Sequence, residues 1–354
     1  MKIAVLHARQ PLTTDLREVF PEAECVVVSA GEPAVREDAG GEPPQVIRAD
    51  RGDWAAALAE VRPDEVVTND EYALADCAGL RDGLGLAARL PAYPLNYLDK
   101  VTMKRELAAA GITVPRFVAF EPVVARVDAE VLSRVGLPVV VKPRQEANSR
   151  GVRVLHTVAE LRDWLAAHEG EAGWEAEEFV LGVGHHVNSV VRTRHVEPVQ
   201  VGRYLGPLLD LPIGSMSVRY DSLHELNEHV VAALGYAEMV VHTELIVRDG
   251  VPVVVEVAGR APGGDVARMA MRHAGINLEA AHLRLQAGLP IDSPHRTDLD
   301  AAWVWRRPGE LPPVTSPHEV YRRSTIDSVV LWNADPAELE RDAVLLSRPS
   351  GGVS

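Results

Sequence analysis

The sequence predicts an α/β fold with added α+β elements, and three observations support this prediction. Over roughly the first ninety residues, short apolar strands alternate with stretches of helical spacing, which is the layout of a parallel sheet covered by helices. The apolar run at residues 137–141 reads LPVVV, as in a strand that is buried on both faces. Two further apolar segments flank the turn RDG at residues 248–250 and therefore predict a β-hairpin.

The N-terminal region is predicted to form one of two or three domains, for which 354 residues give enough length. Strands are expected in KIAVLHA, ECVVVSA and DEVVTND, and helices around residues 54–61 and 72–80. Residues 68–71 (TNDE) follow the third strand, so they could meet a ligand at the carboxyl edge of the sheet. An ordinary turn with Asn and Asp caps explains them equally well. We expect a flexible loop at 37–44 and a proline-bearing connector at 88–96.

The charge of the chain restricts its partners. Lys and Arg total 36 and Asp and Glu total 51, which gives a formal net charge of −15 and argues against nucleic acid or an acidic membrane as partner. No apolar run has membrane-spanning length and the apolar part of the start is too short for a signal peptide, so we expect a soluble, cytoplasmic protein. Cys25 and Cys77 lack metal-ligand or redox spacing and are expected to be buried thiols.

Lysine is scarce in this chain, because only four of the 36 basic residues are lysines. Lys142 ends the apolar run and precedes Pro143 and a polar turn that contains glycine. A compact, rotatable ammonium group at such a strand end needs an anionic partner, which favours a functional role for Lys142. Lys2 and Lys104 fit the simpler interpretation of surface lysines.

A second lysine, Lys100, is expected in the first turn of a helix that Asp99 caps and Gly111 ends. The helix dipole makes a cation in the first turn unfavourable unless an anion is also present. Taken alone, Lys100 also fits a solvated position. An edge-like strand is expected between this helix and residue 137.

A segment that crosses between two predicted sheets follows a helix at residues 158–168. Glu177 and Glu178 precede the apolar residues 179–181, and Gly182 and Gly184 follow them. Such a segment could offer its backbone to the edge of a flat ring. It could equally be a hinge between domains with exposed acids, and both interpretations can hold at once.

The predicted hairpin carries Glu244 and Glu256 on its opposite arms. We expect the two positions to lie almost opposite each other, so that both carboxylates point to one side. Facing acids repel each other unless a cation lies between them, as when carboxylates hold Mg²⁺ together with phosphates. The alternative of two solvated acids is disfavoured because both arms are apolar. Arg260 follows Glu256 by four positions and directly precedes the glycine-rich segment 261–265, where it is placed to bind an oxyanion.

In this order, the motifs resemble those of the ATP-grasp superfamily. They are DK and MK within residues 99–104, VVVKP ending at Pro143, the loop with Ser149, Gly151 and Val152, EEFV at 177–180, the paired glutamates and the E-x-x-x-R that ends at Arg260. The resemblance covers roughly residues 1–290. It implies an N-terminal Rossmann-like pre-ATP-grasp domain at 1–95, a small lid domain at 96–182 and a larger C-terminal domain at 183–354.

The resemblance also implies roles for individual residues. The predicted ATP ligands are Lys100 and Lys142 for the phosphates, Ser149 and Gly151 in the loop that closes over them, and Glu177, Glu178, Phe179 and Val180 beside the adenine. Glu244 and Glu256 would bind Mg²⁺ or Mn²⁺, and Arg260 would stabilise the phosphoryl group in transfer. The segment Gly263, Gly264 and Asp265 would contact the substrate.

Three positions depart from the family pattern. Ala258 stands where an Asn metal ligand is common, so a second metal ion would lack one ligand. The acid that often binds the ribose falls near Gly184 and His185, which makes His185 the candidate substitute. The phosphate loop has large residues at 144–146 and at 148 where small ones are common.

The resemblance implies an enzyme that transfers the γ-phosphoryl group of ATP to a carboxylate and joins the acyl phosphate to an amine. The segments EVAGRAPGGD and HAGINLEAAHLRLQAG look most like the carboxylate–amine ligase branch, including L-amino-acid ligases, so amino acids are the favoured substrates. Another ligase or carboxylase of the superfamily and a non-enzymatic nucleotide sensor are the alternatives. The expected partners are small molecules and, for assembly, a second copy in a homodimer. Residues 296–354 carry no motif and are expected to complete the C-terminal domain and line the acceptor pocket.

Overall fold

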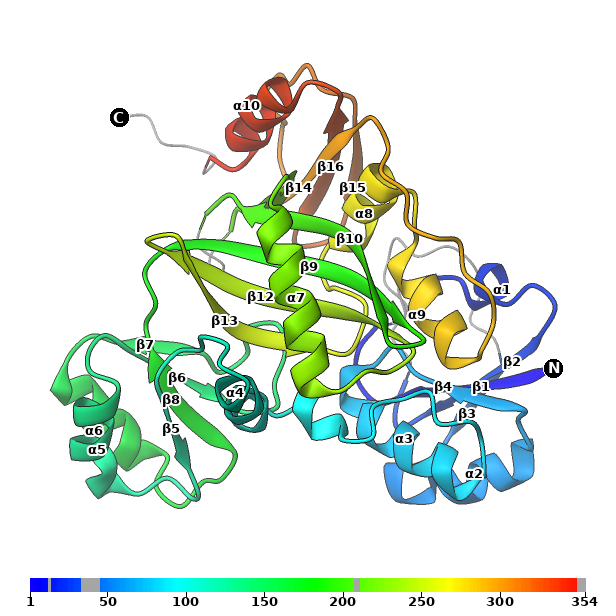
Figure 1. The fold of residues 1–354 in the computed structure, drawn as a ribbon, viewed down its shortest axis with the longest axis horizontal. Helices are drawn as coiled ribbons and strands as arrows, with labels where there is room; N and C mark the ends of the chain where they lie inside the picture. The colour runs from blue at the N-terminus through cyan, green and yellow to red at the C-terminus, as the bar shows by residue number, and fades with distance from the viewer. Residues whose placement is uncertain (12–13, 33–44, 207–210, 349–354) are drawn as a thin grey trace. The chain divides into compact units, whose positions relative to one another are not determined.

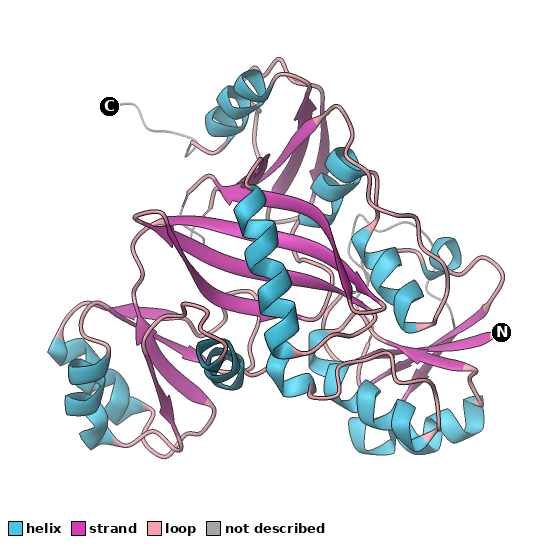
Figure 2. Cartoon of the chain, in the orientation of Figure 1, coloured by secondary structure: helices cyan, strands magenta, loops and turns pink. Residues whose placement is uncertain are grey.

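The structure is a computed structural model that describes residues 1–11, 14–32, 45–206 and 211–348. Two compact units divide the chain. Unit 1 comprises Met1–Pro94, His186–His242 and Ala258–Ser354, and unit 2 comprises Leu95–His185 and Thr243–Val257. The loop expected at 37–44 lies outside the described residues. Figure 1 labels the elements along the chain, and Figure 2 separates helices from strands.

The N-terminal part of unit 1 is a parallel sheet with the strand order β3-β2-β1-β4, as the alternating pattern predicts. Its strands are β1 (Lys2–His7), β2 (Glu24–Ser29), β3 (Gln45–Arg48) and β4 (Glu65–Val67). Its helices are α1 (Leu16–Val19), η1 (Arg51–Asp53), α2 (Trp54–Val61), η2 (Glu71–Ala73) and α3 (Leu74–Gly83). The predictions for 54–61 and 72–80 are therefore confirmed, while β3 was not predicted.

The largest sheet among the described residues has the order β13-β12-β9-β10-β11-β14-β16-β15 and includes segments of both units, since most of β12 and β13 belongs to unit 2. The strands are β9 (Val183–Arg192), β10 (His195–Tyr204), β11 (Ile213–Val218), β12 (Met239–Arg248), β13 (Val251–Ala258), β14 (Asp300–Arg306), β15 (His318–Arg322) and β16 (Asp327–Asn333). The helices are α7 (Asp221–Leu234), α8 (Val266–Ala274), α9 (Leu278–Gln286) and α10 (Pro336–Leu346).

Unit 2 contains an antiparallel sheet with the order β5-β8-β6-β7. Its strands are β5 (Phe117–Phe120), β6 (Val139–Pro143), β7 (Arg153–Leu155) and β8 (Trp174–Glu178). Its helices are η3 (Pro94–Tyr97, which starts in unit 1), α4 (Lys100–Ala109), η4 (Ala125–Val127), α5 (Asp128–Arg134) and α6 (Val158–Ala167). Helices α5 and α6 cover one face of this sheet (Figure 1) and share an apolar core with it.

Two predictions about unit 2 differ in outcome. The edge position expected for the strand after α4 is confirmed, because β5 ends the sheet order. The strand expected at 137–141 is wrong in its limits, since β6 runs from Val139 to Pro143. Leu137 is 38% exposed and lies before the strand, and Val140 is only half-buried. Val139 and Val141 face the apolar core of unit 2, so Lys142 lies on the opposite face of β6, where it is also buried.

The predicted hairpin is confirmed. Only Asp249 and Gly250 separate β12 from β13, and both have positive φ, at 51° and 80°. This is the backbone that a tight two-residue hairpin requires, and Gly adopts it without steric penalty.

Within the described ranges, no helix has both the length and the apolar character to cross a bilayer. Both cysteines are free thiols, and Cys77 is buried while Cys25 is half-buried. Burial raises the pKa of Cys25 to about 11 and that of Cys77 to about 12, so neither thiol is activated as a nucleophile.

Candidate functional site

Helix α4 places two lysines on one buried face of unit 2. Asp99 caps the helix by accepting a hydrogen bond from the backbone N–H of Thr102, as the sequence predicts. Lys100 and Lys104 lie one turn apart and are 5% and 0% exposed. The interpretation of Lys104 as a surface lysine is therefore wrong. It shares the buried face with Met103 and Leu107 because residues three and four apart line the same side of a helix.

Strand β8 supplies the acids that neutralise these lysines. Glu175 and Glu177 are two positions apart along the strand, so both side chains point to the same face of the sheet. Lys104 Nζ lies 2.7 Å from Glu175 Oε1 and also donates a hydrogen bond to Glu177. Lys142 sits directly opposite Glu175 in the neighbouring strand β6, and its Nζ lies 2.5 Å from Glu177 Oε1.

The hairpin brings a third acid to the same cluster. Glu256 Oε1 of β13 lies 3.1 Å from Lys100 Nζ. The backbone N–H of Val257 points at Met103 Sδ at 3.1 Å, which holds this end of β13 against α4. The cluster of Lys100, Lys104, Lys142, Glu175, Glu177 and Glu256 is called the lysine–glutamate cluster below, and its formal charges balance at three of each sign.

The charged forms are stabilised inside this cluster. Burial alone would lower the pKa of Lys142, but the carboxylates of Glu177, Glu175 and Glu256 outweigh burial and raise the pKa above its ordinary value. Burial alone would raise the pKa of Glu177, but Lys104 and Lys142 outweigh it and lower the pKa. Both side chains therefore stay ionised at neutral pH.

The loop that follows Lys142 is fixed to the start of α4. Arg144 donates from Nε and Nη2 to the two carboxylate oxygens of Asp99, both at 2.9 Å, and Gln145 Nε2 donates to Asp99 at 3.2 Å. Lys100 Nζ donates to the backbone oxygen of Glu146 at 2.7 Å. The large residues at these loop positions therefore have a structural reason, since they attach the loop to the helix that carries Lys100.

The end of the same loop can only be glycine. Asn148 and Ser149 have φ of 56° and 54°, and Gly151 has φ of 73°. A Cβ at Gly151 would lie 2.9 Å from Pro143 Cγ, which is too close for any side chain. Backbone N–H groups in such successive left-handed positions are a common cradle for phosphate oxygens.

The segment after β8 lies against the hairpin within unit 2. A Cβ at Gly182 would come within 2.4 Å of the backbone oxygen of Val247, so this position requires glycine. Glu178 binds Arg116 Nε at 3.0 Å and Arg248 Nη1 at 2.6 Å, and Arg248 closes β12. Phe179 is half-buried and Val180 is 7% exposed. The His185 Nδ1 lies 2.9 Å from the backbone oxygen of Val183.

Arg260 belongs to unit 1, whereas the lysine–glutamate cluster belongs to unit 2. Arg260 Nε lies 2.7 Å from Glu71 Oε2, and Nη1 donates to the backbone oxygen of Ala261 at 2.9 Å. Glu71 follows β4, and the neighbouring Asp70 accepts from the backbone N–H groups of residues 8, 10 and 72 at 2.8–2.9 Å and also from that of residue 9. Asp70 is thus a cap, as one of the two interpretations of residues 68–71 held, and Glu71 orients Arg260.

Asp265 is completely buried in unit 1. Its carboxylate accepts hydrogen bonds from Ser328 Oγ and Trp305 Nε1, lies 2.7 Å from Arg268 Nη1 and lies 3.5 Å from Arg323 Nη2. Gly264, the preceding residue, lines a cavity of about 160 Å³ with Thr14, Asn277 and Glu279. Gly264, one of the three residues predicted to meet the substrate, therefore lines this cavity.

The donor set was tested against a divalent cation. No group of three or more His, Cys, Asp or Glu side chains suited to a metal occurs within the described ranges. Glu256 is in the lysine–glutamate cluster, and Glu244 is a half-buried residue of β12. In phosphoryl-transfer enzymes, Mg²⁺ is usually coordinated by one or two carboxylates, and phosphate oxygens and water complete the coordination. Glu244 and Glu256 therefore fit Mg²⁺ when a nucleotide is also bound.

Sequence reasoning missed Lys104 and Glu175, although both left a signal. Lys104 interrupts the apolar face of a helix, four residues after Lys100 and beside Met103. Glu175 and Glu177 recur at the period of a strand, which puts two acids on one face. A charged residue on an otherwise buried face requires a partner of opposite sign. Lys104 on the helix and the two glutamates on the strand are these partners.

No protein-family model matches the chain. Among curated proteins, the uncharacterized protein y4rH of Sinorhizobium fredii (strain NBRC 101917 / NGR234) is 26% identical over 206 residues, which cover 54% of this chain and 42% of that protein. The alpha subunit of the mitochondrial methylcrotonoyl-CoA carboxylase of Glycine max is 30% identical over 114 residues, 32% of this chain and 15% of that protein. The D-alanine–D-alanine ligase of Stutzerimonas stutzeri (strain A1501) is 26% identical over 238 residues, which cover 62% of this chain and 72% of that protein. The chain thus spans less than half the length of the first two.

Solved structures are similar over nearly the whole chain. The L-amino acid ligase from Bacillus licheniformis has a TM-score of 0.69 at 19% identity, with 96% of this chain and 95% of that chain covered. The N5-carboxyaminoimidazole ribonucleotide synthetase from Thermus thermophilus has a TM-score of 0.73 at 20% identity, with 99% of both chains covered. The biotin carboxylase domain of the Hydrogenobacter thermophilus 2-oxoglutarate carboxylase, solved with MgADP, ADP and bicarbonate, has a TM-score of 0.70 at 12% identity, covering 93% and 86%. These likenesses concern the fold.

Proposed function

We propose that this chain, which has the ATP-grasp fold, is an ATP-dependent carboxylate–amine ligase that releases ADP and phosphate. The observation that carries the proposal is the lysine–glutamate cluster. Three of the four lysines of the chain are buried there, and Lys100 and Lys142 both lie near Glu256. Buried ammonium groups beside a carboxylate that can accept a metal ion are the arrangement that binding a nucleoside triphosphate requires.

In this proposal, Lys100 and Lys142 hold the ATP phosphates, and the backbone around Ser149 and Gly151 covers them. Glu177, Glu178, Phe179 and Val180 border the adenine, and His185 binds the ribose. Glu244 and Glu256 hold Mg²⁺, which neutralises phosphate charge and orients the γ-phosphoryl group when bound. The lid corresponds to residues 96–182, between the pre-ATP-grasp domain at 1–95 and the C-terminal domain at 183–354.

The chemistry proceeds in two transfers. A carboxylate oxygen of the substrate attacks the γ-phosphorus, the bond to the ADP oxygen breaks, and an acyl phosphate forms. The amine then attacks the acyl carbon, the bond to phosphate breaks, and the amine gives up a proton to water. Arg260, which Glu71 holds in place, stabilises the charge on the phosphoryl oxygens, and no covalent bond to the protein is needed.

Amino acids are the favoured substrates, and Gly264 would line their site beside the buried Asp265. The likeness to an L-amino acid ligase and to a D-alanine–D-alanine ligase supports this choice. Carboxylating relatives favour bicarbonate or a purine precursor as the second candidate class. ADP release with single amino acids, amino acid pairs, bicarbonate and aminoimidazole ribonucleotide separates the two.

The direct test is the identity of the products. We expect ADP and phosphate, because the γ-phosphoryl group is the one transferred, and we expect hydroxylamine to trap a hydroxamate of the true carboxylate substrate. Chromatography of the nucleotides and a colorimetric hydroxamate assay measure both. AMP with pyrophosphate among the products would overturn the mechanism.

Arg260→Lys sharpens the same test. A lysine keeps the positive charge but cannot make the bidentate hydrogen bonds of a guanidinium group, and it loses the contact between Nε and Glu71. Turnover should fall by about 10- to 100-fold while ATP affinity changes less than threefold or so, because the interaction is made mainly in the transition state. Normal turnover would remove Arg260 from the mechanism.

A further inference from the structure

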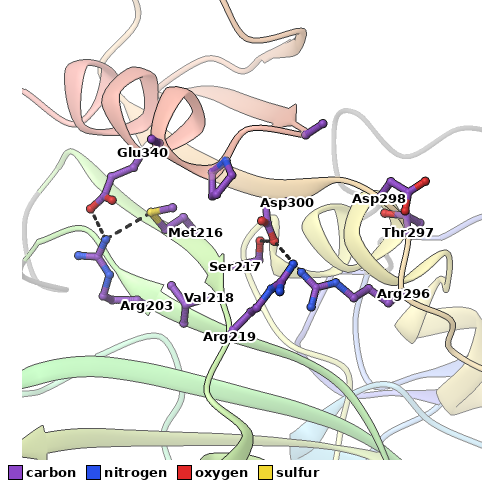
Figure 3. A pocket seen from close by; sticks show the side chains of 13 residues that line it. Arg203, Met216, Ser217, Val218, Arg219, Arg296, Thr297, Asp298, Asp300 and Glu340 are labelled. Atoms are coloured by element: carbon purple, nitrogen blue, oxygen red, sulfur yellow. Dashed lines mark hydrogen bonds and ion pairs between the residues drawn. The ribbon is translucent and has the colours of Figure 1, made fainter.

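Two neighbouring cavities occur in unit 1, away from any residue assigned above. The larger has a volume of about 570 Å³ and lies among β10, β11, the segment before β14 and the start of α10 (Figure 3). The smaller, of about 240 Å³, is lined by β10, the start of α7 and the end of α8. Val218, Arg219 and Arg296 line both cavities, so the two cavities adjoin each other. The larger volume falls in the range of small-molecule sites.

Some charges at this region already have protein partners. Arg203 Nη2 lies 2.5 Å from Glu340 Oε1 and 3.4 Å from Met216 Sδ (Figure 3). Asp300 accepts a hydrogen bond from Ser217 Oγ at 3.1 Å and lies 3.6 Å from Arg296 Nη2. Among the described residues, Arg296 therefore has only this distant ionic partner.

Two other charged residues that line the larger cavity have no such partner among the described residues. Arg219 and Asp298 are exposed, line the larger cavity and make neither a hydrogen bond nor an ion pair with any described residue. One cation and one anion thus remain available at the same cavity wall. A ligand that carries both signs of charge would complement both, while a simple anion would leave Asp298 without a partner.

A second, independent observation comes from the smaller cavity. Gln200 is 1% exposed and His224 is half-buried, and both line this cavity. Gln200 Oε1 and His224 Nδ1 are buried without a hydrogen-bond partner among the described residues. A buried polar atom without a partner is unfavourable, so a polar molecule in the cavity would be stabilised by pairing with either side chain after a small rotation.

We propose that these cavities form a binding site for a free amino acid, with Arg219 and Arg296 at its carboxylate and Asp298 at its ammonium group. The site consists of unit 1 residues, and none of them is assigned to ATP, Mg²⁺ or phosphoryl transfer. The proposal therefore stands independently of the proposed function. An amino acid bound here is a ligand and not the reacting substrate.

Met216 provides a local reporter for the test. It lines the larger cavity beside Arg203 and is one of only six methionines in the chain. With methyl-labelled methionine, NMR titration with L-alanine or L-glutamate should shift the Met216 resonance in a saturable way without ATP. The resonance is assigned by Met216→Leu. Because this signal reports the cavity and needs no turnover, it stays interpretable even if the protein proves not to be a ligase.

Two variants and one control decide the assignment. Arg219→Gln and Asp298→Asn should each weaken binding about tenfold or more, since each removes a charge-assisted contact. Arg307→Gln, which alters an exposed arginine that lines neither cavity, should leave binding unchanged. The proposal is overturned if neither amino acid shifts Met216, if propionate or inorganic phosphate shifts it as strongly, or if both variants bind normally.

Discussion

The lysine–glutamate cluster of unit 2 and the surroundings of Asp265 in unit 1 both bury charge, but they neutralise it with different groups. Asp265 accepts hydrogen bonds from an indole and a hydroxyl and pairs with two arginines. The lysine–glutamate cluster instead uses three ammonium groups on flexible side chains against three carboxylates.

This difference leads us to expect a structural role for the Asp265 charge and a ligand-binding role for the lysine–glutamate cluster. The Asp265 carboxylate has partners in α8, β14 and β16, so we expect it to fix α8 against these two strands. Ammonium groups such as those of Lys100 and Lys142 can exchange a carboxylate for a phosphate at little steric expense. Substitution of Asp265 should therefore lower the stability of the protein, whereas substitution within the lysine–glutamate cluster should weaken ligand binding.

The largest effect is expected from Asp265→Ala. It removes the acceptor of two neutral donors and leaves Arg268 and Arg323 without their buried counter-charge, so the free energy of unfolding should fall by about 3–5 kcal/mol. Urea denaturation measures this change. Nucleotide affinity below the unfolding transition should be that of the unaltered protein, and a selective loss of ATP binding without destabilisation would reverse the comparison.

The next effect is expected from Glu256→Gln in the lysine–glutamate cluster. The amide keeps the shape but cannot neutralise Lys100 or hold Mg²⁺ as a carboxylate does, so turnover should fall about 100-fold or more at ordinary Mg²⁺. Steady-state kinetics over a range of Mg²⁺ concentrations, with circular dichroism as control for folding, test this. Near-normal activity would make the acid purely structural.

The smallest effect is expected from Lys142→Ala. ATP affinity and activity should fall together by about 10- to 100-fold, because one charged contact is lost in both ground and transition states. The free energy of unfolding should fall less than in Asp265→Ala, since Glu177 still pairs with Lys104 and Glu256 still pairs with Lys100. Calorimetric titration with ATP measures the affinity, and Lys2→Ala, at a lysine paired with the exposed Glu24, is the matched control. Equal affinities in the two variants would argue against the phosphate assignment.

Local features of the fold could be predicted from the sequence because they depend on neighbouring residues. The Asp99 cap predicted the start of α4, the RDG turn predicted the hairpin, and alternating apolar runs predicted the parallel sheet. The limits of β6 were predicted less well, because the same apolar run includes Leu137, which lies outside the strand.

The site was predictable only in part, for a related reason. Motif spacing pointed to Lys100, Lys142 and Glu256, which the structure brings into one cluster. Contacts between distant segments have no local signature, as with Glu71 and Arg260, which are separated by 189 positions. Lys104 was misinterpreted because burial of a lysine depends on acids that lie more than 70 residues away along the chain.

The burial of three lysines also determines how the folded protein meets amine-reactive reagents. The Lys2 side chain is 33% exposed, whereas the side chains of Lys100, Lys104 and Lys142 are at most 8% exposed. Among the lysines, acylating labels and amine crosslinkers should therefore attach at Lys2, and the three buried amines should become reactive only on unfolding. The chain thus offers a nearly single-site handle for tethering to a surface or a dye, at a position outside the lysine–glutamate cluster.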